Sequence, residues 1–442
     1  MALPSLEAFS PDAEPVIALI EKLEGDEEIP SHVVGVIVCQ QTPYLSHFAI
    51  RARQGGVVLA TCEEESRILD LRQKVGRLVV VDAFRGKVDV SYASTEDFET
   101  HNHNQRRGLK PVEAPAIEFS ETPSILPLDR VTVSNGGAKA YGARQLLELS
   151  CYGDANFRTP PGVVIPFGVM ESLICLHPSL EREYRSLFDR MVELPADALL
   201  ETLEELRSII RKIELPSLLL SELTRHFGHG SPLMVRSSSN SEDLEETAAA
   251  GLYDSVANIP ADRAAEAIRA VWASLWTRRA TLSRLNHAIP QDQAHMAVLI
   301  QQMVTPGLSF IMHTNNTANQ KPAEVLIELA VGLGETLASA EYPGNPYRMI
   351  CNRLTGNVSM LAFANFSQAV LPDAEWGVVR KTIDYSRIEA STDKLFRESL
   401  GCRLAKIGGF VEAALGCPQN IEGVVADDSV YLVQSRPQQG LA

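Results

Sequence analysis

A histidine at the predicted start of a helix is the first residue of this sequence that could do chemistry. Ser46 is a good helix N-cap because its hydroxyl can accept a backbone N–H, which places His47 in the first helical turn. Free N–H groups and the positive dipole end favour an anion there, and Arg51 shares the helix face. A phosphate on the imidazole would meet a guanidinium; a capping or packed histidine is the alternative interpretation.

A second group of reactive types lies near the C-terminus. Two short apolar runs within residues 417–437 are joined by Asp427, Asp428 and Ser429, which predicts a β-hairpin. Alternation puts Asn420 and Glu422 on one face of the first strand, and Gln434 and Arg436 on one face of the second. A carboxylate, amides and a guanidinium converging on one face would bind Mg²⁺ and polyphosphate together. A structural Glu–Arg cross-strand pair is the alternative.

Two further stretches place a cation beside small or hydroxyl residues. Ser134–Gly142 is expected to be a Gly-rich turn leading into a helix over Ala143–Leu149, and Lys139 lies within the turn. Such a turn can cradle phosphate, although it lacks the spacing and the ending of a P-loop. Arg236 follows an apolar strand and precedes a run of serines, which suits bidentate phosphate contact. A surface strand end with a solvated acidic loop is the alternative for that stretch.

These residues are distributed over two predicted regions. The first is a small α/β region, with a helix at about 63–75, a hairpin around Gly86 and strands at Pro15–Ile20, Val33–Cys39, Val57–Thr61 and Leu78–Val81. Residues 100–126 read as a linker, and its His101 and His103 have no third metal ligand nearby. The second region contains strands over Met296–Met303 and Glu324–Gly334, and an apolar helical stripe within residues 199–213 that is core packing.

Size and composition limit the classes of function. The 442 residues suffice for roughly two to four domains, and 45% hydrophobic with 22% charged residues is typical of a globular protein. The formal charge of −16 argues against nucleic acid or an anionic membrane as the main partner, and no run of about 18 apolar residues predicts a membrane span. Seven cysteines without CxxC spacing indicate reduced thiols rather than a disulfide framework or zinc site. With no signal or transit peptide in view, a cytoplasmic protein is expected.

Several long motifs resemble one enzyme family. RSSSNSEDLEETAAAGLYDS, GLGETLASAEYPG and PQNIEGVVADDSVYLVQSRPQ resemble the nucleotide-binding domain of the glucan, water dikinases, and VRSSS and VQSRP resemble the wider pyruvate phosphate dikinase and phosphoenolpyruvate synthase group. LSHFAIRARQGGVVLATCEEE is similar to the phosphohistidine domain of these enzymes, most closely in the phosphoglucan, water dikinases. The resemblance runs from about residue 15 to 438, with the histidine motif first, as in the water dikinases.

The resemblance implies an α/β (α+β) fold in two parts. A small swivelling phosphohistidine domain would occupy residues 1–99, a linker 100–126, and a two-lobed ATP-grasp-like nucleotide-binding domain 127–442. The chain is expected to begin one or two strands inside the first domain. The family's long N-terminal half with its starch-binding modules has no counterpart in the sequence.

The resemblance also implies roles for individual residues. His47 would take the β-phosphate of ATP, with Arg51 beside it as a further catalytic residue. Nucleotide and phosphate would be bound by Lys139, Arg236, Glu422, Gln434 and Arg436, adenine by the strand with Gln302 and Met303, and Mg²⁺ by Glu422 and Asn420. Two departures stand out: Asn420 occupies a position where aspartate is more usual, and Ala249 one where glycine is more usual.

The function implied is an ATP-dependent dikinase that phosphorylates an α-glucan or phosphoglucan and passes the γ-phosphate to water. The competing hypothesis is a His-phosphorylated relay or regulatory module without a glucan site of its own. A phosphoenolpyruvate synthase relative is disfavoured, because 442 residues leave no room for a pyruvate-binding barrel. A plastid location is expected if the chain is part of a plant or algal enzyme.

Overall fold

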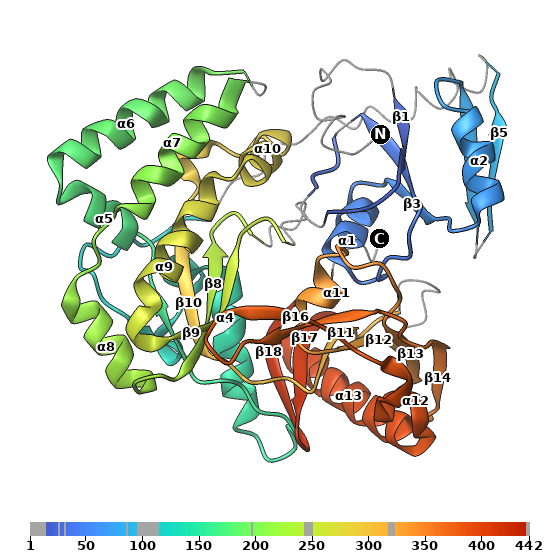
Figure 1. Ribbon diagram of the computed structural model, residues 1–442. Coiled ribbons are helices and arrows are strands. Elements are labelled where there is room, and N and C mark those ends of the chain that lie inside the picture. Colours follow the sequence, from blue (N-terminus) through green and yellow to red (C-terminus); the bar gives the residue numbers. More distant parts are fainter. Residues whose placement is uncertain are drawn as a thin grey trace.

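The computed structural model describes residues 15–24, 27–30, 32–84, 87–94, 115–195, 198–242, 251–316 and 323–438. It has the α/β fold class predicted from the sequence, arranged as a small N-terminal region and two larger lobes (Figure 1). Most of the predicted linker, including His101 and His103, lies outside the described residues, as does Ala249.

The histidine region, residues 15–94, is built on a parallel three-stranded sheet of order β1-β2-β3. Its strands are short apolar runs, which is typical of parallel strands covered on both faces, and the strand predictions for this region are confirmed. The β4–β5 pair forms a separate hairpin. The elements are β1 (Val16–Ile20), β2 (Val33–Val38), α1 (His47–Gln54), β3 (Val58–Thr61), α2 (Glu65–Gln73), β4 (Val79–Phe84) and β5 (Lys87–Tyr92).

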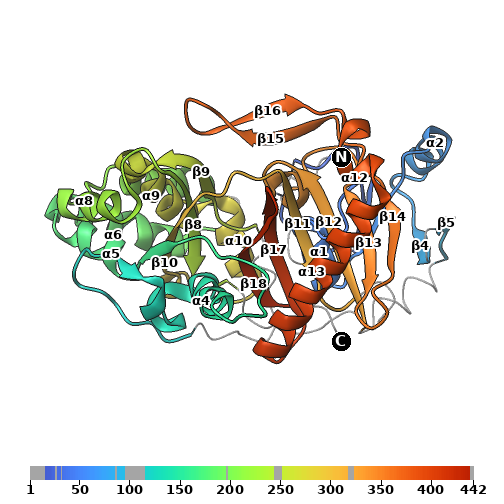
Figure 2. The same ribbon diagram turned by 90° about the horizontal axis from the view of Figure 1, so that it is seen from below.

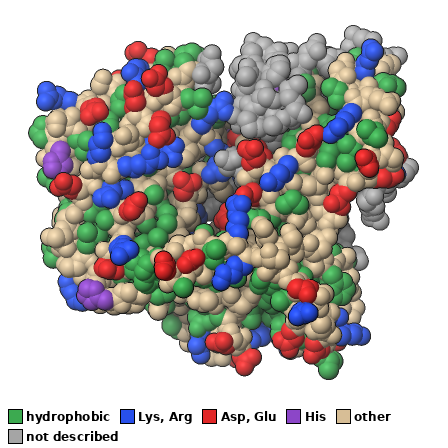
Figure 3. All heavy atoms as spheres, viewed as in Figure 1, with side chains coloured by type: hydrophobic (Ala, Val, Ile, Leu, Met, Phe, Trp, Pro, Cys, Tyr) green, Lys and Arg blue, Asp and Glu red, His purple; other side chains and the backbone are tan. Residues whose placement is uncertain are grey.

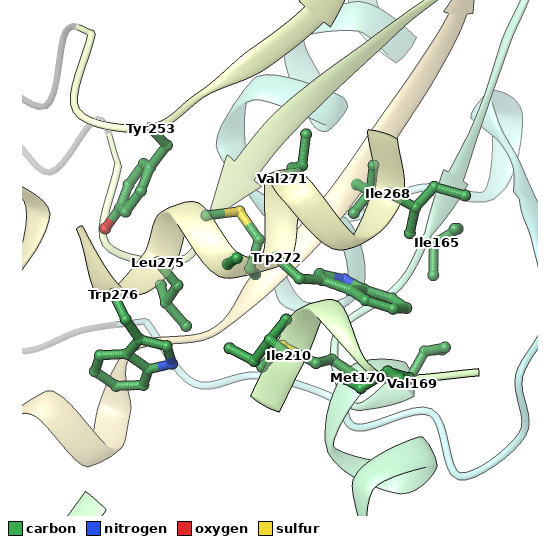
Figure 4. Packing of buried hydrophobic residues seen from close by; sticks show 14 of the residues in the cluster. Ile165, Val169, Met170, Ile210, Tyr253, Ile268, Val271, Trp272, Leu275 and Trp276 are labelled. Atoms are coloured by element: carbon green, nitrogen blue, oxygen red, sulfur yellow. The ribbon is translucent and has the colours of Figure 1, made fainter. Parts of the chain in front are cut away.

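The helical lobe combines an antiparallel sheet of order β6-β7-β10-β8-β9 with helices α5 to α10. Helices pack on the sheet around a large apolar core that includes the fully buried Trp272 and Trp276 (Figure 4). The predicted stripe in 199–213 faces this core. The elements are β6 (Leu126–Pro127), β7 (Gly162–Ile165), α5 (Val169–Cys175), α6 (Pro178–Glu193), α7 (Leu199–Arg211), α8 (Ser217–Phe227), β8 (Pro232–Ser239), β9 (Ser255–Pro260), α9 (Ala264–Ala273), α10 (Arg278–Asn286) and β10 (Met296–Gln302).

The β lobe is an antiparallel sheet of order β14-β13-β12-β11-β17-β18. The long helix α13 packs along one face, and the opposite face meets α1 of the histidine region, as the two perpendicular views show (Figures 1 and 2). The elements are β11 (Leu308–His313), β12 (Glu324–Val331), α11 (Glu335–Ala338), β13 (Tyr347–Asn352), β14 (Val358–Ala362), β15 (Gln368–Pro372), β16 (Val378–Thr382), α12 (Glu389–Thr392), α13 (Lys394–Leu415), β17 (Gln419–Ala426) and β18 (Ser429–Pro437).

One helix joins the two lobes and corrects a prediction. The Gly-rich stretch expected as a turn lies inside α4 (Val133–Ser150), because Thr132 and Asn135 form a reciprocal capping box that starts the helix earlier. Gly137 interrupts it with φ 82° and ψ 165°, and a Cβ there would lie 2.6 Å from Ser238 Oγ. Glycine therefore lets α4 bend against β8. Since α4 also packs on β18, it contacts both sheets.

Among the described residues, no helix combines the length and the apolar character needed to cross a bilayer.

Candidate active site

A cavity of about 580 Å³ lies between the helical lobe, the β lobe and the start of α1. The space-filling view is hollowed between the lobes on this face (Figure 3). Of the residues predicted from the sequence to form the site, those that line the cavity are His47, Lys139, Arg236, Gln302, Met303, Glu422, Gln434 and Arg436.

His47 is the first residue of α1 and stands in the wall of this cavity. The predicted cap is confirmed, because the Ser46 hydroxyl accepts the Ala49 N–H. The side chain is so close to the loop at Gly251 that a Cβ on Gly251 would lie 2.3 Å from His47 Nδ1. Burial, and then the positive charges of Arg436 and Arg51, hold the pKa of His47 well below its usual range. The imidazole is therefore neutral at physiological pH, as a nucleophile must be.

Arg51 does not lie where the helix spacing suggested. Its guanidinium donates to the carbonyl oxygen of Glu27 at 2.7 Å and lies 3.8 Å from the Glu28 carboxylate, within the histidine region. It is buried and is not part of the cavity lining. The structure thus corrects the expectation that Arg51 meets phosphate beside His47: its guanidinium is bound within the histidine region, and its charge lowers the pKa of the imidazole.

The hairpin β17–β18 brings its polar residues together in the predicted way. Asn420 pairs with Arg436 across the strands, and Glu422 pairs with Gln434. Gln434 Oε1 accepts from Arg236 Nη2 at 2.6 Å, and the Glu422 carboxylate lies 3.9 Å from the same guanidinium. Arg236 also donates to the Val433 carbonyl at 2.9 Å. Arg236 belongs to the helical lobe, so it connects the two lobes across the cavity.

Lys139 reaches the cavity from α4 and is held there by two partners. Its Nζ lies 2.9 Å from Glu242 Oε1 and 3.1 Å from Ser237 Oγ. Glu242 in turn accepts the Ser239 N–H at 3.0 Å, so the end of β8 fixes its carboxylate. The ammonium is therefore pointed into the space beside Arg236 rather than into solvent.

Asn420 occupies a different place from Glu422. Its buried side chain is outside the cavity lining, and its Oδ1 has no hydrogen-bond partner. It lies in a row across the sheet between Arg436 and His313. Burial lowers the pKa of His313 to about 3, with Arg53 and Arg436 contributing. His313 is therefore a neutral, buried imidazole behind the cavity.

Gln302 and Met303, at the end of β10, form another part of the cavity lining. Their N–H groups are already used: Gln302 donates to the Pro161 carbonyl at 2.9 Å and Met303 to the Pro232 carbonyl at 2.8 Å. Gln301 also lines the cavity, and its buried Nε2 has no partner. This part of the lining thus offers an apolar wall and a side-chain amide.

Other lining residues were missed by the sequence interpretation. Arg279 from α10, Glu335 from α11 and Gly251 all face the cavity. Burial raises the pKa of Glu335, with the neighbouring charges of Glu341 and Glu422 acting in the same direction. Glu242, Gly251 and Glu335 stand in motifs that carried the family resemblance, whereas Arg279 lies in a helix without any motif.

The donor set suits a hard cation that keeps other oxygen ligands. Within the described ranges, no group of three His, Cys, Asp or Glu side chains is arranged to hold a metal alone. Glu422 and Glu335 are carboxylates on the cavity wall, and the unpartnered Asn420 oxygen lies two residues along β17 from Glu422. One or two carboxylates, completed by water and phosphate oxygens, is the way Mg²⁺ is usually held.

Two family models match the chain. Residues 134–442 match the pyruvate phosphate dikinase, AMP/ATP-binding domain, and residues 6–100 match the alpha-glucan water dikinase, phosphohistidine-like domain. The cavity thus lies where the matched nucleotide-binding part meets the matched histidine part.

Similar curated proteins agree with this match. The chain is 28% identical to an alpha-glucan water dikinase of Solanum tuberosum, described as chloroplastic, over 96% of its own length and 29% of that protein. It is 27% identical to alpha-glucan water dikinase 2 of Arabidopsis thaliana over 96% of its length and 33% of that protein. A rifampicin phosphotransferase of Bacillus cereus is 29% identical over 62% of the chain and 32% of its own length.

The chain therefore spans about a third of the length of these relatives. Over more than half of its residues it matches one family model, and the alpha-glucan water dikinases of Solanum tuberosum and Arabidopsis thaliana match 96% of the chain. The chain belongs to the family of phosphotransferases that carry the pyruvate phosphate dikinase AMP/ATP-binding domain, here preceded by a glucan water dikinase phosphohistidine-like domain.

Proposed function

We propose that this protein is an ATP-dependent dikinase that forms a phosphohistidine at His47 and transfers the phosphate to a glucosyl hydroxyl of an α-glucan. One observation carries the proposal: a neutral imidazole stands in the wall of a cavity that Lys139, Arg236, Arg279 and Arg436 also line. A nucleophile beside converging cations is the arrangement that phosphoryl transfer requires.

In the first step, His47 attacks the β-phosphorus of ATP, the bond from that phosphorus to the oxygen bridging to the α-phosphate breaks, and AMP leaves. Water attacks the γ-phosphorus, the bond from that phosphorus to the oxygen bridging to the β-phosphate breaks, and inorganic phosphate leaves while His47 keeps the β-phosphate. Arg236 and Lys139 hold the phosphate groups and neutralise charge as it develops, which is where most of the catalysis comes from. Their partners Gln434 and Glu242 keep both cations in place before ATP arrives.

ATP would lie with its base against Gln302 and Met303 and its phosphates toward His47. Charge supports this orientation, because Arg436, Lys139 and Arg279 act on the His47 imidazole, whereas Met303 contributes apolar surface to the cavity. Mg²⁺, when bound, would be held by Glu422 with Asn420 and Glu335 nearby, and it would supply positive charge to the phosphate oxygens.

In the second step, a glucosyl hydroxyl attacks phospho-His47, the phosphorus–nitrogen bond breaks, and the hydroxyl proton goes to solvent as the neutral imidazole returns. The acceptor class rests on the extent of similarity. Proteins named alpha-glucan water dikinase match 96% of the chain, including the histidine region, whereas the phosphoenolpyruvate synthase of Pyrococcus furiosus matches 54% of it.

The test of the first step uses ATP labelled at the β-phosphate. We expect the wild-type protein to acquire an acid-labile label, His47→Ala to acquire none, and AMP and inorganic phosphate to appear in equal amounts. Arg51→Lys is a control that keeps the charge outside the cavity and retains labelling. An unlabelled wild-type protein that nonetheless binds ATP would refute the dikinase proposal.

The test of the second step incubates labelled protein with amylopectin, with phosphorylated amylopectin and with no acceptor. We expect label to move to a glucan. Comparing the two polymers also shows whether the acceptor must already be phosphorylated. Label that stays on the protein in all three incubations would contradict the glucan acceptor and favour the relay module.

A further inference from the structure

A buried carboxylate of the β lobe accepts hydrogen bonds from the main chain shortly before His47. Glu328 lies in the middle of β12 and its side chain is fully buried. Its Oε1 accepts the N–H of Tyr44 at 3.0 Å, and its Oε2 accepts the N–H of Leu45 at 2.8 Å. Those two residues lead directly into the Ser46 cap of the His47 helix. Neither Glu328 nor its partners Tyr44 and Leu45 line the central cavity.

Arg348 completes this contact. Its guanidinium lies 2.6 Å from Glu328 Oε1, so the carboxylate enters the interface already paired with a cation of its own lobe. The Tyr44 ring lies between two guanidinium groups, with Arg53 4.2 Å and Arg348 5.7 Å from its centroid. Hydrogen bonds to an ionised carboxylate are stronger than those between neutral groups. A buried carboxylate without a partner would instead lower the stability of the protein strongly.

The apolar contacts around this carboxylate are reciprocal. Leu45 of the histidine region is fully buried in the core of the β lobe. Conversely, Ala340, which follows α11, is fully buried in the core of the histidine region, and its carbonyl accepts from Gln40 Nε2 at 3.1 Å. Each part thus buries one residue in the core of the other. At the rim of the contact, Asn345 Nδ2 donates a hydrogen bond to Gln41 Oε1 at 2.6 Å.

These observations require a reversible contact if the proposed function holds. In this arrangement His47 faces a cavity of about 580 Å³, a size suited to one small molecule. An α-glucan cannot share that cavity with ATP, so phospho-His47 must leave it. An interface with a polar, charge-paired centre separates more readily than an apolar one, because each partner is resolvated when it opens.

We infer that Glu328 is a positioning residue for the first half-reaction: with Arg348, it latches the Tyr44–Leu45 main chain so that His47 is held at the nucleotide cavity, and its release frees phospho-His47 for the acceptor. This inference rests on the proposed function. It assigns to Glu328 no contact with ATP and none with the acceptor.

The test separates the two half-reactions in Glu328→Gln, in which one amide N–H₂ would face the backbone donors. We expect the rate of His47 labelling from β-labelled ATP to fall at least tenfold, while the Kd for ATP changes less than twofold. Transfer from the labelled variant to glucan keeps the wild-type rate or exceeds it. Glu412→Gln, which breaks a comparable ion pair with Arg353 on the far side of the β lobe, is the matched control with no effect on either rate.

A readout independent of activity accompanies the rates. Amide hydrogen exchange in the peptide covering residues 43–48 is expected to rise at least tenfold in Glu328→Gln, with β12 and β13 unchanged. Arg348→Met tests the same latch from the rim, because it removes only the cation that accompanies the carboxylate, and it should give a smaller change of the same kind.

Three results would overturn the latch: unchanged exchange at residues 43–48 in both variants, equal losses in labelling and in transfer, or a loss of ATP affinity that matches the loss of labelling. Failure of the proposed function has a different signature. If the wild-type protein is never labelled but Glu328→Gln still raises exchange at residues 43–48, the dikinase proposal fails, while the contact by which Glu328 holds this segment is upheld.

Discussion

Of the parts that meet at the central cavity, the helical lobe and the histidine region differ greatly in the size of their hydrophobic cores. The helical lobe surrounds an extensive apolar cluster with two fully buried tryptophans. In the histidine region, the described buried cluster comprises Ala18, Ile20, Leu23, Val33, Val36, Val38, Phe48 and the borrowed Ala340. Arg236 and Arg279 are thus carried by a lobe with a large core, whereas His47 is carried by a region with a small one. Because burial of apolar area is the main source of stability, the part that must move is also the part that depends most on its neighbour.

The largest expected effect comes from filling the space between these two parts. A Cβ on Gly251 would meet the His47 ring at 2.3 Å, and the φ of +73° adds strain. We expect Gly251→Ala to lower the rate of His47 labelling more than a hundredfold. The matched control is Gly230→Ala, which has a similar φ of +67° with nothing near the new Cβ. Equal rates in the two variants would show that His47 does not need its present position.

A core truncation in each part tests the difference in core size directly. Phe48→Ala should cost about 3–5 kcal/mol in the free energy of unfolding, which is enough to unfold the small histidine region while ATP binding survives. Ile268→Ala in the helical lobe should cost about 2–5 kcal/mol yet leave both parts folded. Hydrogen exchange over β1–β3 and ATP titration measure the two outcomes. A single cooperative transition in Phe48→Ala, with ATP binding lost, would contradict the comparison.

Arg236 offers a way to sharpen the comparison on the binding side. Lysine keeps the charge but loses the fork that reaches Val433 and Gln434 across the cavity. We expect Arg236→Lys to lower the labelling rate about 30-fold, or ~2 kcal/mol, and to weaken ATP binding as well. Arg225→Lys on the exposed face of α8 is the control. A lower labelling rate with unchanged ATP affinity would show that Arg236 acts in the transfer to His47 and not in ATP binding.

The last expected effect leaves the labelling rate unchanged and concerns the acid stability of the β lobe. The pKa of His313 is about 3 in the folded state and about 6.5 when unfolded, so the unfolded state binds the proton in the interval between. The stability from this neutral histidine is complete above pH 6.5 and is lost as the pH falls. At pH 5 the free energy of unfolding is expected to be lower by about 2 kcal/mol. His313→Leu should remove this part of the pH slope in urea unfolding between pH 7.5 and 5. An unchanged slope would mean that His313 titrates normally.

Local patterns in the sequence predicted the residues of the site better than they predicted the contacts that bring its parts together. The alternation in β17 and β18 predicted that their polar residues converge on one sheet face, and the register pairs Asn420 with Arg436 and Glu422 with Gln434, since two strands joined by a short turn have few possible registers. The Ser46 cap was predictable because the hydroxyl and the N–H of Ala49 that it accepts are only three residues apart. Spacing failed for Arg51, since it fixes the direction of a Cβ but not the end point of a long side chain.

The elements that depend on distant residues were beyond such reasoning. Thr132 starts α4 before the glycines, and only the approach of Ser238 explains why Gly137 bends it. Glu328 lies 283 residues from Leu45, and nothing in its apolar strand marks it as a partner of the histidine helix. Arg279 likewise reaches the cavity from a helix without a motif.

The position of Ala340 in the histidine core has a consequence for how the chain is made. Its carbonyl bonds Gln40, a residue that precedes it by 300 positions. At a ribosomal rate of about 5–20 residues per second, Gln40 is translated roughly 15–60 seconds before Ala340, the residue of the β lobe that joins the histidine core. During that interval the apolar surface of the histidine region is incomplete and exposed, so this region is the one a nascent-chain chaperone should hold.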